Sequence, residues 1–95
     1  MSLDVNQVKT TLQHELDSLQ RMAQELRLQA SLARAELKAQ LDRLEAKLSR
    51  AQEEVQRLGA HVKAPLQEIE TAVRALLAEV RAGFEQLRKA FENPN

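Results

Sequence analysis

The chain has no cysteine, tryptophan or tyrosine, and only two residues each of glycine, proline and phenylalanine. Without cysteine there is no disulfide framework and no thiol chemistry, and the redox compartment cannot be inferred. So few aromatic side chains make a compact core hard to build in 95 residues, because a small chain buries a modest fraction of its surface. We therefore expect partner chains to supply part of the burial.

An excess of one charge is also lacking, since 14 basic residues balance 14 acidic ones. The balance holds in each half of the chain, so we expect no nucleic-acid partner, which usually requires a basic stripe. No apolar run approaches the roughly 20 residues of a membrane span, and the first residues lack the plan of a signal peptide. We expect a cytoplasmic protein.

What the chain has in abundance is strong helix formers in an apolar stripe. Apolar residues recur every three or four positions, which places them on one face of a helix. The 24 steps from residue 5 to residue 91 average about 3.58 residues, close to the 3.6 of a straight helix. The stripe comprises Val5, Val8, Leu12, Leu16, Leu19, Ala23, Leu26, Ala30, Ala33, Leu37, Leu41, Leu44, Leu48, Ala51, Val55, Leu58, Val62, Leu66, Ile69, Val73, Leu76, Val80, Phe84, Leu87 and Phe91.

One interruption of the helical pattern is expected, between Gly59 and Pro65. Glycine suits the position after a helix end and proline suits the first turn of a helix. The sequence predicts an all-α fold, a long antiparallel helical hairpin that is coiled-coil-like and assembles into a helical bundle. Its single domain spans 1–95, with helix one about 4–58, a connection at 59–64 and helix two about 65–92. A continuous kinked helix is the alternative, because the stripe keeps phase through the gap.

The length difference between the two helices predicts self-association. Helix one would be about 82 Å long and helix two about 42 Å, so the N-terminal half of the stripe would be uncovered. Such an apolar surface implies a partner. We expect an antiparallel homodimer whose long helices cross near residue 31, with a tetramer as the near alternative. The predicted contact residues, which include members of a second apolar stripe, are Leu12, Leu16, Leu19, Leu26, Leu28, Ala30, Leu32, Ala33 and Leu37.

Residues able to carry chemistry are few. His14, near Glu15 and Asp17, has no second histidine four positions on, as a metalloprotease-type helix would. His61 lies in the gap between the two predicted helices, where a solvent-exposed or capping role is expected. No glycine-rich phosphate loop, nucleophile elbow or metal-ligand spacing occurs. The sequence predicts no catalytic residue, no cofactor and no metal site, and hence a protein that is not an enzyme.

Two other functions are compatible with long amphipathic helices. One is a small all-helical enzyme similar to chorismate mutases, whose long helix places cations around a dianionic substrate. The cations available here are Arg21, Arg27, Arg34 and Lys38, each accompanied by acids. The other is binding to a lipid or granule surface, as in apolipoproteins and phasins. It is favoured less, because the polar face carries no basic excess.

Two segments resemble a group of uncharacterised bacterial coiled-coil proteins. They are residues 25–36, followed by Leu44 and Glu45, and residues 83–90. The resemblance implies a long helix, a break and a shorter helix ending in a Gly-aromatic-Glu turn, with Phe84 where tyrosine is expected. It implies no activity. The most consistent interpretation is a structural, scaffold or assembly protein that acts through self-association and contacts with a protein partner.

Overall fold

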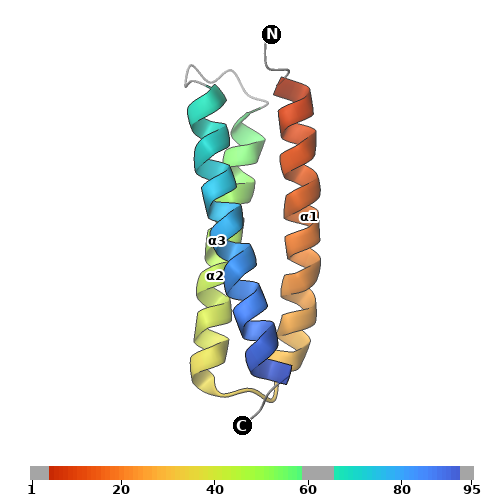
Figure 1. The fold of residues 1–95 in the computed structure, drawn as a ribbon, viewed down its shortest axis with the longest axis vertical. Coiled ribbons are helices and arrows are strands. Elements are labelled where there is room, and N and C mark those ends of the chain that lie inside the picture. The colour runs from red at the N-terminus through yellow and green to blue at the C-terminus, as the bar shows by residue number, and fades with distance from the viewer. Residues whose placement is uncertain (1–4, 59–65, 93–95) are drawn as a thin grey trace.

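The chain folds into three helices that pack side by side. The computed structural model describes residues 5–58 and 66–92, and within them lie α1 (Val5–Ala30), α2 (Ala35–Arg57) and α3 (Leu66–Glu92). The helices run alternately up and down, so that α2 is antiparallel to both α1 and α3 (Figure 1). The bundle measures 51 × 19 × 17 Å. The predicted all-α fold with helices assembled into a bundle is confirmed.

The predicted first helix, about 4–58, is wrong in its continuity. It is divided into α1 and α2 by a turn at residues 31–34, whereas α3 agrees with the predicted second helix, about 65–92. At the turn the Ala33 amide donates to the Ala30 carbonyl at 3.0 Å, and the Ser31 hydroxyl donates to the Leu28 carbonyl at 2.9 Å. Arg34 then takes an extended conformation, with φ −65° and ψ 151°, and α2 begins.

Tertiary packing, and not local sequence preference, favours the turn. Folding α1 back onto α2 lets one chain bury its own stripe, without the loss of translational freedom that binding a second chain costs. Against this gain stands the loss of a few helical hydrogen bonds at residues 31–34. Several backbone groups that lose helical hydrogen bonds form other hydrogen bonds within the turn, so the energetic cost of the break is limited.

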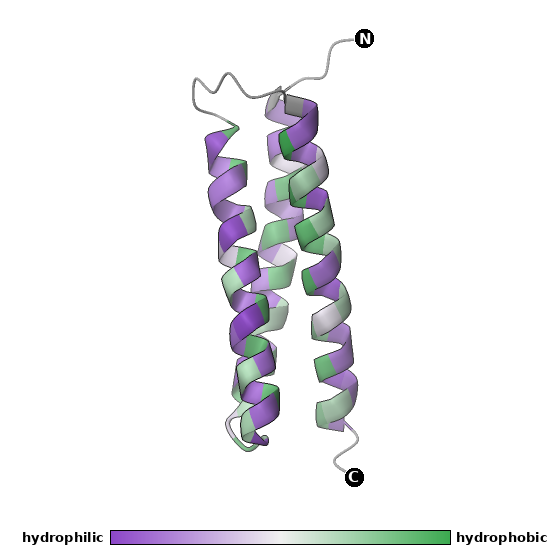
Figure 2. Ribbon diagram, turned by 90° about the vertical axis from the view of Figure 1, so that its left-hand side faces the viewer, coloured by the Kyte–Doolittle hydropathy of each residue, from purple (hydrophilic) through white to green (hydrophobic). Residues whose placement is uncertain are grey.

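The apolar stripe forms a single core along the bundle axis. In the described part of the chain most stripe residues are buried, and no polar or charged residue is buried with them. In Figure 2 the hydrophobic and hydrophilic residues alternate along each helix, as expected for helices with one buried face. One detail of the pattern differs, since Leu77 is buried and the stripe residue Leu76 is half-buried. Leu77 is buried in place of Leu76 because the packing of α3 on α1 and α2 fixes the rotation of α3 about its own axis.

At Gly83, α3 packs tightly against the Leu44 side chain of α2. A Cβ atom added at Gly83 would lie 2.6 Å from both Cδ1 and Cδ2 of Leu44, so only glycine leaves room for this side chain. Gly83 and Phe84 lie inside α3, and Phe84 is fully buried. The Gly-aromatic-Glu turn implied by the resemblance is therefore absent at residues 83–85, which are helical.

The predicted hairpin break falls outside the part of the chain that the structure describes. Gly59, Pro65, His61 and the connection at 59–64 lie outside the described residues.

Candidate interaction surface

An open groove runs between α1 and α2 on the outside of the bundle. Its volume is about 570 Å³. Its floor is apolar, formed by the buried side chains of Ala23 and Leu48, and its walls are mostly uncharged and polar. The lining residues are Gln20, Ala23, Gln24, Arg27, Leu28, Glu45, Leu48, Ser49 and Gln52.

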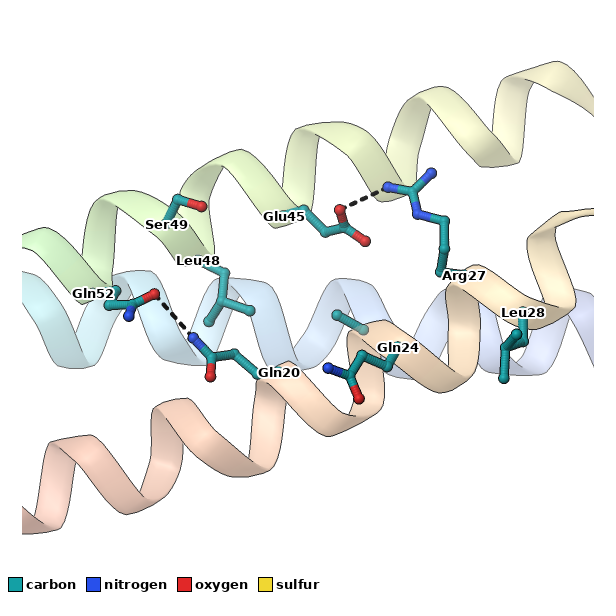
Figure 3. A pocket seen from close by; sticks show the side chains of 9 residues that line it. Gln20, Gln24, Arg27, Leu28, Glu45, Leu48, Ser49 and Gln52 are labelled. Carbon is teal, nitrogen blue, oxygen red and sulfur yellow. Dashed lines mark hydrogen bonds and ion pairs between the residues drawn. The ribbon is translucent and has the colours of Figure 1, made fainter.

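An amide pair closes one end of this groove. The Gln20 Nε2 atom donates to the Gln52 Oε1 atom at 2.9 Å, and the pair is partly buried (Figure 3). The remaining amide atoms of the two side chains stay available to a partner, since a glutamine amide can make further hydrogen bonds. Such groups position a ligand but supply no nucleophile or general base.

Arg27 forms the charged end of the groove, nearer the α1–α2 turn. Its Nη2 atom lies 2.7 Å from Glu45 Oε2 and 2.8 Å from Asp42 Oδ1. The hydrogen bonds that the Arg27 guanidinium donates to Glu45, and secondarily to Asp42, raise its pKa above the ordinary value. Two carboxylates therefore already engage the cation that an anionic substrate would need. In Figure 3 Arg27 reaches across toward α2, whereas Leu28 points away from it.

Two leucines at the turn are exposed, in contrast to the buried leucines of the core. Leu28 is 78% exposed and Leu32 is 96% exposed, and they are the exposed large hydrophobic side chains of the described residues. We call them the exposed leucine pair. An isolated exposed leucine is ordinary, but these two are four positions apart at one end of the bundle.

The predicted contact residues fall into three groups. Five of them, Leu12, Leu16, Leu19, Leu26 and Ala30, are buried inside the chain's own core. Ala33 and Leu37 are partly buried against that core, and the exposed leucine pair is free of it. The premise that the N-terminal half of the stripe is uncovered is therefore wrong for this fold, because α2 and α3 cover it.

The cations considered for a mutase-like site do not gather around a cavity. Of the four, Arg27 lines the groove, while Arg21 and Arg34 are exposed and Lys38 is half-buried. His14 is exposed on α1. Within residues 5–58 and 66–92, no group of three His, Cys, Asp or Glu residues could hold a metal ion.

Sequence reasoning missed the pairs Gln20–Gln52 and Arg27–Glu45. Neither pair has a helical spacing, since the partners lie 32 and 18 positions apart. The only signal that could have found them is the turn at 31–34, because its position sets which residues of α1 face which residues of α2.

None of the helices in the described part of the chain is long and apolar enough to cross a membrane. Comparisons of the chain with protein-family models, curated proteins and solved structures found no match.

Proposed function

We propose that this protein is a non-enzymatic assembly module that acts through contacts with a second copy of itself and with a protein partner. The observation that carries the proposal is the exposed leucine pair, Leu28 and Leu32, at the end of a bundle whose other large apolar side chains are buried or partly buried in the described residues. The chain has its own core, so this surface serves an external contact.

The size of the surface supports reversible association. Burying a leucine side chain is worth about 1.5–3 kcal/mol, so the pair offers about 3–6 kcal/mol per copy. That gain must offset the association cost and cannot by itself give tight binding. The groove between α1 and α2 lies next to the pair and adds polar hydrogen-bonding groups along its walls.

The alternatives have less support. A lipid or granule surface would require exposed apolar helix faces with basic margins, and here the apolar faces are packed into the core. A mutase-like activity would require several unpaired cations around a cavity, whereas the groove holds Arg27 in contact with two acids.

A double substitution tests the proposal. Leu28→Glu with Leu32→Glu places two charges on the exposed leucine pair without touching the core. The matched control is Thr10→Glu with His14→Glu, which has the same spacing on exposed positions of α1. Both proteins should show the same helical content by circular dichroism.

Light scattering from about 1 µM to 1 mM should show a growing dimer fraction for the native protein. We expect the leucine double variant to require at least about 10-fold higher concentration for the same fraction, because each 1.4 kcal/mol is tenfold. The control should resemble the native protein. Equal dimer fractions in all three proteins would contradict the role of the leucine pair, and a native protein monomeric at 1 mM would contradict self-association. Co-sedimentation with liposomes, against buffer alone, should leave the native protein in the supernatant.

A further inference from the structure

The turn between α1 and α2 is built from residues that favour a helix. Residues 31–34 read Ser-Leu-Ala-Arg, without the glycine, asparagine or proline that usually ends one. No described residue has a positive φ, so no left-handed conformation holds the turn. The Leu32 and Ala33 amides already donate to carbonyls three residues back. Arg34, directly before α2, has an extended ψ that departs from helical geometry.

The apolar pattern also continues through the turn. Ala30, Ala33, Leu37 and Leu41 are spaced by three, four and four residues, so a helical turn would place them on one face. In the folded chain Ala33 and Leu37 are only partly buried, and Leu32 is exposed. The exposed Leu32 and the partly buried Ala33 and Leu37 therefore lie together where the stripe crosses the turn.

The register of α1 against α2 shows where two straightened chains would cross. Gln20 contacts Gln52 and Arg27 contacts Glu45, and both pairs are centred on residue 36. The Arg27–Asp42 pair is centred between residues 34 and 35. If the same contacts formed between two copies related by a twofold axis, the axis would pass near residue 35. Ala33 would then lie near the partner's Leu37, and Leu32 near the partner's Ala39.

From these three observations we infer that two copies associate by exchanging α1. Residues 31–34 become helical, α1 and α2 join into one helix, and the α1 of each copy packs on the α2 and α3 of the other. The occupant of the exposed surface at Leu32 is thus a second copy of this chain. The inference rests on the proposed function, since it specifies how self-association occurs.

The exchange keeps the contacts between helices of the closed bundle and adds new ones. All α1–α2 and α1–α3 contacts are remade between copies, as in other exchanged dimers. The additional contacts are those of the crossing, where Leu32, Ala33 and Leu37 meet their partners' residues. The opposing cost is the association itself, so the exchanged form should accumulate only at high concentration.

Cross-linking distinguishes exchange from simple docking. Cysteines replace Gln20 and Gln52 in a chain that otherwise has none, and a short bis-maleimide joins them. In the closed chain these side chains are hydrogen-bonded to each other at 2.9 Å. In the straightened chain they lie about 48 Å apart on one helix, and each lies beside its counterpart in the other copy.

The protein is refolded at about 1 mM, separated by size, and each fraction is cross-linked after dilution and examined on a denaturing gel. We expect single-chain products from the monomer fraction and covalent two-chain products from the dimer fraction. Single-chain products from the dimer would overturn the exchange but leave self-association intact. A protein that gives no dimer fraction at all would contradict the proposed function as well.

A second test acts on the hinge. Arg34→Pro suits the closed turn, because the φ of −65° at Arg34 is that of proline. In the straightened helix the same proline is internal, which should lower the dimerisation constant about 100-fold per chain. The matched control, Arg34→Ala, removes the same side chain and should not weaken dimerisation. Equal dimer fractions for the two variants would refute the straightening of residues 31–34.

Discussion

Because Leu44 packs against Gly83, we expect the effect of Gly83→Ala on the free energy of unfolding to change sign when Leu44 is truncated. In an ordinary helix interior Gly→Ala stabilises by about 0.5–1 kcal/mol, because alanine loses less backbone entropy on folding. At Gly83 the added Cβ would lie 2.6 Å from both methyl carbons of Leu44 and 3.2 Å from its Cγ. Because both methyl carbons and the branch carbon Cγ of Leu44 are close, the side chain must move as a whole.

The magnitude follows from two opposing effects. Overpacking of a core position costs about 1–3 kcal/mol, which exceeds the gain in helix propensity. We therefore expect Gly83→Ala to lower the free energy of unfolding by about 1 kcal/mol. In a Leu44→Ala background the obstacle is gone, and the same change should raise the free energy of unfolding by about 0.5–1 kcal/mol.

Urea unfolding followed by circular dichroism measures both steps of this double-mutant cycle. The Leu44→Ala protein should remain folded, since a chain of this size has about 5–14 kcal/mol of stability and the truncation costs about 2–5 kcal/mol. Ala82→Gly, at an exposed position of α3, is the control for helix propensity alone. It should cost about 1 kcal/mol in either background. If Gly83→Ala stabilises the native protein as much as the Leu44→Ala protein, the close packing of α2 on α3 is refuted.

Two further predictions test the rotation of α3 and the closure of the bundle. Leu77→Ala should lower the free energy of unfolding by about 2–5 kcal/mol, and Leu76→Ala by about half as much. Leu77 is only 1% exposed and Leu76 is half-buried, so equal losses in urea unfolding would mean that α3 is rotated. Small-angle scattering of a dilute sample should give a radius of gyration near the 15.2 Å of the Cα atoms. A first helix continuous over 4–58 would give about 24 Å, the value for an 82 Å rod, and such a result would contradict the closed bundle.

The sequence predicts Leu28 and Leu32 as contact residues, but it does not show that they are the exposed part of an otherwise covered apolar surface. Leu28 and Leu32 belong to a second apolar stripe beside the main one, and both were predicted to lie in a contact. The sequence could not show that the main stripe would be covered by the chain itself. That outcome depends on the turn at residues 31–34, which no glycine or proline marks.

Local sequence preference sets the helical class, the apolar stripe along each helix and the extent of α3. These properties follow from helix propensity and a period near 3.6, both of which act within a few residues of each other. The tertiary structure decided the turn after Ala30, the choice of Leu77 over Leu76 and the need for glycine at residue 83. Each depends on contacts between residues far apart in the chain, where burial of one helix against two others outweighs the small local preference for continuing a helix.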